Sequence, residues 1–422
     1  MASKTPNEIK KVSVIGLGYV GLPTAAIIAN RGINVTGVDV NAETVETINK
    51  GDIHIVEPDL DILVRSAVAS GNLNATTSPE PADVFILAVP TPFKDGNKPD
   101  LSYLEQASST LAPVLEKGNL VVLESTSPVG TTAQIAAWLE AARPDLTFPS
   151  SDNSDPDISI AHSPERVLPG RVLIELVDND RVIGGLSETC SERAKNFYSL
   201  FVNGTCQLTN AHTAELVKLA ENAYRDTNIA FANEMSLVCD KLDVDVWKMI
   251  ELANLHPRVE ILKPGPGVGG HCIAVDPWFI VDSAPEQTPL IQASRHVNDG
   301  KPDWVIEQAL EATEPKAAIA CLGLAYKADI DDLRESPAME IVEKLAAQHD
   351  GEILIVEPNI AELPPNLKIL ENTKYCGYEQ AVQQADTVIV LTDHSEFKDV
   401  DQSLLTTKKL IDTRGIWRDS RK

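Results

Sequence analysis

The sequence lacks an apolar run that approaches the roughly 18 to 20 residues needed to cross a bilayer. Its first segment, "MASKTPNEIKK", also lacks the apolar stretch of a secretory signal. These two absences predict a protein that stays in the cytoplasm and has no membrane partner.

Closely spaced cysteines are also missing. Six cysteines lie far apart with no C-x-x-C pair, which excludes a zinc ribbon and argues against a disulfide framework. We therefore expect reduced thiols, most of them small core residues, and no bound metal.

Basic residues are scarce. Lys and Arg number 36 against 62 Asp and Glu, and the formal net charge is −26. Nucleic-acid binding needs clustered positive charge to neutralise phosphates, so this balance argues against a nucleic-acid partner. An anionic small ligand would need a local group of basic side chains.

The chain has 422 residues, more than one compact core normally holds. Near its start, "KKVSVIGLGYVGLPTAAIIANRGINVTGVDVN" predicts a buried strand over 12–15, a helix over 22–28 and a second strand over 34–40. "ADVFILAVPTP" and "GNLVVLESTSP" predict two more buried parallel strands. This order is typical of a doubly wound α/β domain.

The pattern changes near residue 209, where apolar residues recur at helical spacing over "HTAELVKLAENAYRDTNIAFANEMSLVCDKL". After residue 315, "KAAIACLGLAYK", "GEILIVEPN", "ADTVIVLTDH" and "KKLIDTRG" repeat the order of the first half. The predicted fold class is α/β, with two Rossmann-like doubly wound domains joined by a long central helix and a helical middle domain. The predicted domains are 1–208, 209–312 and 313–422.

"GLGYVG" places Gly16, Gly18 and Gly21 between a strand and a helix, and Asp39 follows the next strand. In this context the glycines let a pyrophosphate approach the helix N-terminus, and the acid can bind ribose hydroxyls. An acid with no adjacent arginine favours NAD over NADP, because a carboxylate repels a 2′-phosphate. The alternative, that these are only turn glycines, does not explain this context.

Thr91 and Thr126 follow successive strands and can line the cofactor crevice, although Thr-Pro and Ser-Pro pairs are also ordinary turn formers. "SPERVLPG" places Glu165 and Arg166 on a loop, where a solvated turn is the alternative.

Lys218 and Asn222 share a face of the long helix, with Arg225 close to the same stripe. Lys and Asn can stabilise negative charge on a substrate oxygen, although a solvated face is the common alternative. In "GPGVGGHCIAVDPWF", Cys272 lies in a glycine-rich loop that suits a nucleophile, and Asp276 can orient water or a proton carrier. No role for His271 follows from the sequence.

Positive side chains precede and follow this loop. His256 and Arg258 stand before it, and Lys327 and Arg334 follow a strand of the second half. They can clamp a diphosphate, or form ordinary surface salt bridges.

Together these motifs resemble the nucleotide-sugar 6-dehydrogenase (UDP-glucose/GDP-mannose dehydrogenase) family, whose members carry a cysteine in a G-G-x-C loop, here "GVGGHC". The resemblance covers nearly the whole chain, including "ESTSPVGTT", "AELVKLAENAYRDTNIAFANE" and "GLAYKADIDDLRESP". It implies an N-terminal NAD domain, a helical dimerisation middle, a C-terminal UDP-binding domain and at least a homodimer. It also implies oxidation of a UDP-sugar C6 alcohol to a carboxylate through a cysteine thiohemiacetal and thioester.

Within the family, "SPERVLPGRVLIELVDNDRVIGG", "NLHPRVEILKPGPGVGGHCIAVDPWFIV" and "VNDGKPDWVI" resemble the members that oxidise UDP-N-acetyl-D-mannosamine for surface polysaccharides. UDP-glucose enzymes typically have Ser in place of His271 and Pro-Lys in place of Ala274 and Val275.

The resemblance assigns Cys272 as nucleophile, Lys218 as acid/base or oxyanion stabiliser, Asn222 beside it, and Glu165 and Asp276 as supports for water and for Lys218. The NAD contacts that it implies are Gly16, Gly18, Tyr19, Val20, Gly21, Asp39, Thr91, Thr126 and Arg334. The substrate contacts that it implies are Arg166, Val167, Lys218, Asn222, Arg225, His256, Arg258, Gly269 and Lys327.

Several alternatives stay open at this point. The same chemistry can act on UDP-N-acetylglucosamine or UDP-glucose. A two-electron β-hydroxyacid-type dehydrogenase shares the Rossmann turn and a cleft Lys and Asn, but needs no thiol. A catalytically silent NAD-dependent sensor needs no turnover at all.

Overall fold

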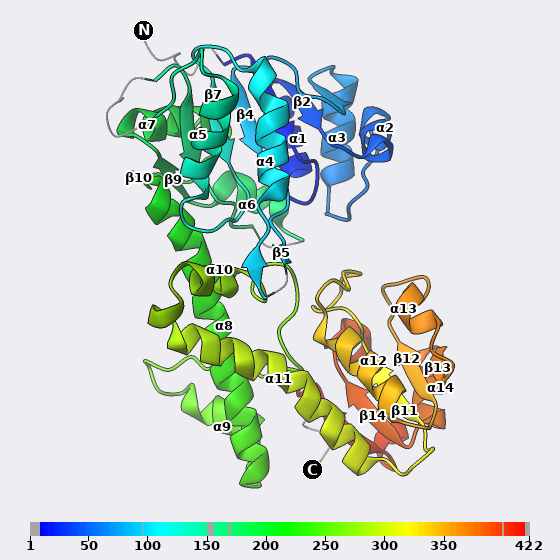
Figure 1. Cartoon of the computed structure of the whole chain (residues 1–422). Coiled ribbons are helices and arrows are strands. Elements are labelled where there is room, and N and C mark those ends of the chain that lie inside the picture. Colours follow the sequence, from blue (N-terminus) through cyan, green and yellow to red (C-terminus); the bar gives the residue numbers. More distant parts are fainter. Residues whose placement is uncertain (1–8, 95, 150–155, 168–169, 399–400, 418–422) are drawn as a thin grey trace. The chain divides into compact units, whose positions relative to one another are not determined.

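The computed structural model describes residues 9–94, 96–149, 156–167, 170–398 and 401–417 (Figure 1). The chain forms two compact units, one of residues 1–221 with 278–283 and the other of residues 222–277 with 284–422. Residues 1–8, which hold most of the segment examined for a signal, lie outside the described residues. In the described part of the chain, no helix combines the length and apolarity needed to cross a membrane.

The first unit is built on an eight-stranded sheet of order β10-β9-β8-β7-β4-β1-β2-β3, with a separate two-stranded β5-β6 ribbon. All neighbours in the large sheet are parallel except β8 and β9, which are antiparallel. The strands are β1 Lys11–Ile15, β2 Asn34–Val38, β3 Leu73–Thr76, β4 Val84–Leu87, β5 Phe93–Lys94, β6 Lys98–Pro99, β7 Leu120–Leu123, β8 Ser159–His162, β9 Arg181–Gly185 and β10 Cys206–Asn210.

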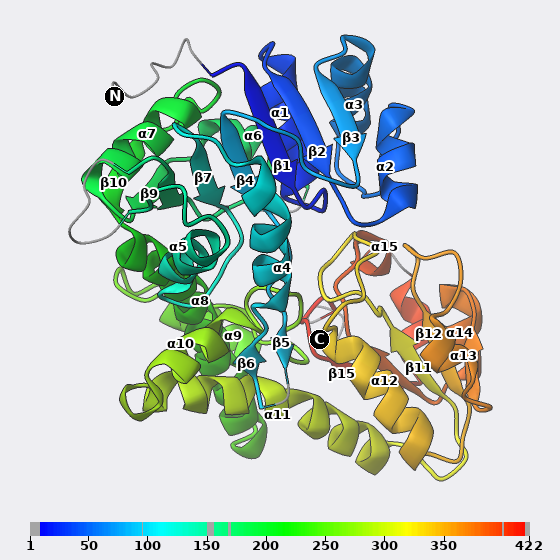
Figure 2. The same ribbon diagram turned by 45° about the horizontal axis from the view of Figure 1, so that its top comes forward.

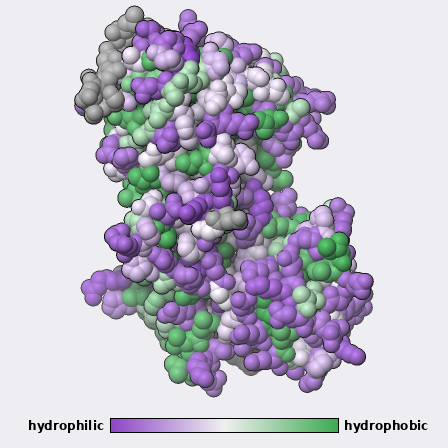
Figure 3. Space-filling view, viewed as in Figure 1, coloured by the Kyte–Doolittle hydropathy of each residue, from purple (hydrophilic) through white to green (hydrophobic). Residues whose placement is uncertain are grey.

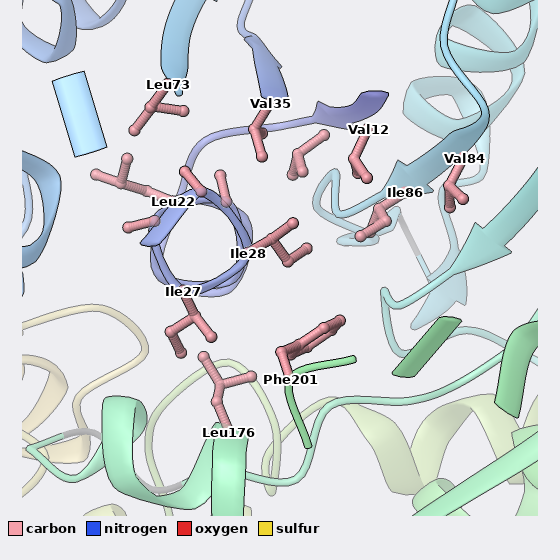
Figure 4. Close-up of a cluster of buried hydrophobic side chains, with 14 of the residues drawn as sticks. Val12, Leu22, Ile27, Ile28, Val35, Leu73, Val84, Ile86, Leu176 and Phe201 are labelled. Carbon is pink, nitrogen blue, oxygen red and sulfur yellow. The ribbon is translucent and has the colours of Figure 1, made fainter. Parts of the chain in front are cut away.

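Helices cover both faces of this sheet. The helices of this unit are α1 Gly21–Asn30, α2 Ala42–Asn49, α3 Leu60–Ala69, α4 Ser102–Leu111, η2 Ala112–Val114, α5 Thr131–Ala142, α6 Val172–Asp178 and α7 Glu188–Tyr198. Apolar residues of α1, α3, α6 and α7 form one core with one face of the sheet, and those of α4 and α5 form a second core with the other face (Figure 2). Figure 4 shows α1 in the first core, between the Val12, Val35 and Ile86 side chains and those of Leu176 and Phe201.

The predicted strand–turn–helix–strand start is confirmed, with one correction at the end of β2. The strand predicted to reach Val40 ends at Val38, and the Val40 side chain is 88% exposed. A prediction from apolar residues alone therefore ends β2 two residues too late, because Val40 lies beyond the last paired residue of the strand.

The predicted long helix is α8, Ala211–Lys241, which begins in the first unit and continues into the second. The remaining helices are α9 Val246–Ala253, α10 Asp276–Ser283, η3 Pro285–Gln287, α11 Pro289–Ala312, α12 Pro337–Gln348, α13 Pro365–Lys368, α14 Tyr378–Gln384, α15 Ser395–Lys398 and η4 Gln402–Leu405.

A second parallel sheet, of order β13-β12-β11-β14-β15, forms in the second unit. Its strands are β11 Ile319–Leu322, β12 Ile353–Val356, β13 Thr373–Tyr375, β14 Thr387–Val390 and β15 Lys409–Asp412. Helices α11, α12 and α13 pack on one face, and α14 and α15 pack on the other. The order reproduces β3-β2-β1-β4-β7 of the first sheet, which confirms the predicted repeat of two Rossmann-like halves.

Hydrophilic residues predominate on the face shown in Figure 3, and the hydrophobic residues there lie in small patches.

Candidate active site

Four of the predicted cofactor contacts follow the carboxyl ends of neighbouring strands. In the sheet register Ile15 lies beside both Leu87 and Val38, and Leu87 lies beside Leu123. The turns that follow carry Gly16, Thr91, Thr126 and Asp39. Ligands of open α/β sheets bind at this edge, so the topology brings these residues to one place.

The three glycines of "GLGYVG" differ in how closely other atoms surround them. A Cβ on Gly16 would lie 2.6 Å from the Ala88 carbonyl oxygen, and Gly16 has a φ of 93°. A Cβ on Gly21 would lie 1.8 Å from the Gly16 carbonyl oxygen. For Gly18, however, no atom of the described residues lies within 4 Å of a Cβ built there. Gly16 and Gly21 therefore serve the turn and the packing of α1, whereas Gly18 leaves open space beside the turn.

This difference gives a testable pair of variants. Gly21→Ala is expected to lower the free energy of unfolding by about 1–3 kcal/mol, because the backbone must move to admit the methyl group. Gly18→Ala should leave the thermal melting midpoint unchanged but raise the KM for NAD by about tenfold or more, since its methyl group occupies the phosphate approach. Melting curves and NAD titrations of both variants check this, and equal loss of stability in the two would contradict it.

The surroundings of the turn fit a dinucleotide. Asp39 is held at the end of β2 by the Leu17 and Asn41 backbone N–H groups, which donate to its two oxygens at 3.0 and 2.9 Å. The Thr91 hydroxyl is buried and has no hydrogen-bond partner among the described residues, which leaves it available to a cofactor amide. The first turn of α1 holds no acidic residue, as phosphate binding requires. Tyr19 is exposed and Val20 half-buried beside this turn.

The first turns of α8 are fixed to the Thr126 loop. The fully buried Glu215 carboxylate accepts the backbone N–H groups of Gly130 and Thr132, each at 2.7 Å, at the start of α5. A carboxylate there is stabilised by the helix dipole. Lys218, half-buried, stands three residues further along α8 and therefore on a neighbouring part of the same face.

The loop after β8 carries the next two predicted residues. Glu165 is buried, and the Arg166 guanidinium pairs with Glu221 of α8 through Nε at 3.1 Å and Nη2 at 2.9 Å. Val167 is half-buried in the same loop. The hydrogen bonds of Glu215 and the salt bridge of Glu221 thus hold the segment of α8 that carries Lys218.

The glycines of the cysteine loop lie close to another segment of the second unit. Added Cβ atoms would meet protein: the Tyr326 Cβ at 2.7 Å from Gly269, the Tyr326 ring at 3.0 Å from Gly270 and the Pro337 Cβ at 2.8 Å from Gly267. Gly267 and Gly270 also have positive φ angles of 147° and 84°. These glycines therefore let the loop pack against the segment after β11.

Cys272 is exposed at the turn that precedes α10. The backbone N–H of Asp276, the first residue of α10, donates to the Cys272 carbonyl oxygen at 2.8 Å. The buried Asp276 carboxylate accepts a hydrogen bond from the Asn222 side-chain amide of α8. The structure thus brings together three predicted residues of the second unit, Cys272, Asp276 and Asn222. Arg225, one turn further along α8, is exposed.

The predicted clamps lie on two other segments. His256 and Arg258 are exposed in the loop after α9, where the Arg258 backbone N–H donates to His256 Nδ1 at 3.3 Å. Arg334 pairs with both oxygens of Asp332, and Lys327 is half-buried after β11. Desolvation and the Arg334 charge lower the pKa of His271, which favours its neutral form.

The predicted residues divide between the two units. Those from Gly16 to Lys218 belong to the first unit, and those from Asn222 to Arg334 belong to the second. That Cys272 and Lys218 act on the same substrate, as the family resemblance implies, stays a prediction. Within the described ranges, no group of three or more His, Cys, Asp or Glu side chains is arranged to hold a metal ion.

Sequence reasoning did not assign roles to several supporting residues. Glu124 could have been found because it lies within the quoted "ESTSPVGTT". Glu215 could have been found because it lies one helical turn before Lys218. For Arg181, the first residue of β9, which pairs with Glu165 of the loop after β8, the sequence contains no such signal.

Comparison with known proteins places these features in a family. Residues 10–202, 212–300 and 320–419 match the NAD binding, central and UDP binding domains of the UDP-glucose/GDP-mannose dehydrogenase family. The chain belongs to this family of NAD-dependent oxidoreductases, and NAD is the cofactor for which its first unit is built.

Individual relatives are similar over nearly their whole length. A UDP-N-acetyl-D-mannosamine dehydrogenase of Campylobacter jejuni is 59% identical over 93% of this chain and 98% of its own. An NDP-N-acetyl-D-galactosaminuronic acid dehydrogenase of Ralstonia nicotianae is 56% identical over 98% of each chain. The solved UDP-D-ManNAc dehydrogenase of Pyrococcus horikoshii is 41% identical, with a TM-score of 0.87 over 96% of each chain.

Proposed function

We propose that this protein oxidises the C6 alcohol of UDP-N-acetyl-D-mannosamine to the carboxylate, through a thiohemiacetal and a thioester on Cys272. The observation that carries the proposal is the placement of Cys272, the one exposed thiol of the six cysteines, next to Asp276 and Asn222. The relatives named for this substrate support the choice of sugar. The uronate product suits surface polysaccharide synthesis.

Each proposed residue has one task. The glycine turn, Asp39 and Thr91 would hold NAD, which would supply the hydride acceptor for both oxidations when bound. Lys218 takes the proton of the C6 hydroxyl and stabilises negative charge on its oxygen. Cys272 adds to the aldehyde carbon and forms the thiohemiacetal. Asn222 fixes the Asp276 carboxylate, and Glu165 supports the water that releases the acid.

A second candidate substrate is favoured by one comparison. The Ralstonia relative is named for N-acetyl-D-galactosaminuronic acid, so the corresponding N-acetylgalactosamine nucleotide is a direct competitor. The two sugars differ only in stereochemistry and carry the same reacting alcohol.

The test measures NADH per sugar and compares substrates. We expect two NADH per UDP-sugar and the highest kcat/KM with UDP-N-acetyl-D-mannosamine among that sugar, UDP-N-acetylgalactosamine, UDP-N-acetylglucosamine and UDP-glucose. One NADH per sugar would contradict the thioester route and favour a two-electron dehydrogenase. No NADH with any of them would favour a sensor.

We also propose a homodimer formed through α8. Tyr224, Phe231 and Val238 recur at seven-residue spacing and are exposed, as is Leu242. Such a stripe on a helix is typical of a helix–helix interface. Sedimentation equilibrium measures the mass in solution, and a monomer at micromolar concentration would contradict the proposal.

A further inference from the structure

A buried charge cluster lies behind the Glu165 loop in the first unit. Arg181, at the start of β9, is 4% exposed, and its Nη2 donates to Glu165 Oε2 at 3.0 Å. The other oxygen, Glu165 Oε1, accepts the backbone N–H of Arg166 at 2.6 Å. Two donors on separate oxygens fix the direction of this carboxylate.

The guanidinium of Arg181 also contacts the Tyr198 ring and lies near Glu124. It stacks over the Tyr198 ring at 4.6 Å from the ring centroid, and the Tyr198 hydroxyl donates to Glu124 Oε1 at 2.7 Å. Arg181 Nη1 lies 3.9 Å from the same Glu124 oxygen. Burial raises the pKa of Glu124 to about 7, an effect that the Arg181 charge opposes. Glu165, whose Oε2 lies 3.0 Å from Nη2, is the carboxylate that Arg181 contacts more closely.

The hydrogen bonds of Arg181 are directed mainly at Glu165. Among the described residues, its Nε and Nη1 have no hydrogen-bond partner, and Nη2 also meets the Leu176 carbonyl oxygen at 3.4 Å. Burying a guanidinium with incomplete hydrogen bonding is costly, and an apolar residue often serves the fold as well. The presence of Arg181 is therefore better explained by what it does to Glu165 than by stability.

We propose that Arg181 is a positioning residue that holds the Glu165 carboxylate for hydrolysis of the Cys272 thioester, an inference that rests on the proposed function. In this step a water oxygen bonds to the thioester carbonyl carbon, and one water proton passes to Glu165. The carbon–sulfur bond then breaks, which releases the sugar acid and the Cys272 thiolate. No oxidant is consumed, so the step is separate from both hydride transfers.

The experiment compares the full-length enzyme with Arg181→Met and Arg181→Lys under excess NAD and UDP-sugar. We expect Arg181→Met to release two NADH per active site in a first burst and then to turn over about 100-fold more slowly, because Glu165 is misplaced. Intact-mass measurement after acid quench should show the sugar acyl group on Cys272 in most molecules. Arg181→Lys, which keeps the charge, should recover part of the rate and show less adduct.

A matched control separates positioning from general damage. Arg193→Met removes another partly buried arginine of this unit, whose Nη1 donates to Ser159 Oγ at 2.7 Å, and should give no adduct. If Arg181→Met does not fold, Arg181→Lys decides alone: slower hydrolysis with adduct supports the proposal, and a wild-type rate overturns it. Equal slowing of burst and steady state without adduct also overturns it. Absence of two NADH per sugar in the unmodified enzyme overturns the proposed function and this inference together.

Discussion

Cys272→Ser is expected to reduce steady-state NADH formation from the UDP-sugar by ~1,000-fold or more, since a serine hydroxyl is a poor nucleophile beside a thiolate. The position itself supports this expectation, because Cys272 is exposed in the turn that precedes α10. NADH absorbance, with product analysis for aldehyde and acid, measures the effect.

The other cysteines provide the control. Burial raises the pKa of Cys376 and of Cys206, and raises that of Cys321 to about 12, so these groups stay protonated at neutral pH. Cys376→Ser should therefore keep activity within about twofold, as is usual for a change away from a site. Full activity in Cys272→Ser, or comparable losses in the two variants, would refute the covalent route.

Lys218→Met is expected to lower kcat by about 100- to 10,000-fold with little change in substrate KM, because proton transfer and oxyanion stabilisation act in the transition state. Unlike the Arg181 variant, it should abolish the NADH burst, since the first hydride transfer already depends on it. Lys218→Arg should not restore the rate, because a guanidinium does not give up its proton. Rapid-mixing absorbance at several substrate concentrations separates kcat from KM.

Lys241→Met is the matched control for this variant. Lys241 is exposed in the last turn of the same helix, α8, so its removal tests only the loss of a lysine from that helix. A kcat close to wild type is expected there. A rise in KM alone for Lys218→Met would assign Lys218 to substrate binding and contradict its role in proton transfer.

The parts of the fold that repeat in sequence were predictable. A strand followed by a glycine turn is recognisable from local sequence at Gly16, and again at Gly323 in the second half. Both sheets form as these signals predict. The antiparallel pairing of β8 and β9 was not predicted, because it depends on how a loop returns the chain along the sheet.

The candidate site also combines residues that the sequence predicts with residues that it does not. Asp39, Thr91 and Thr126 were found from their place after strands, a local feature of the sequence. The Arg181–Glu165 pair joins the first residue of β9 to the loop after β8, two segments that the fold brings together, so no spacing rule identifies it. The number of glycines before Cys272 is evident in the sequence. Their close packing against Tyr326 and Pro337 is not, because those residues lie more than fifty positions later.

The packing of the cysteine loop against Tyr326 and Pro337 joins two modules of the family. The cysteine loop belongs to the stretch matched as the central domain, whereas Tyr326 and Pro337 belong to the stretch matched as the UDP binding domain. A bulkier residue on one side of this contact therefore requires a matching change on the other side. In a chimera whose C-terminal module comes from a distant relative, other side chains would face Gly269 and Gly270. Such a chimera will need the donor's cysteine loop as well, because the two surfaces must fit.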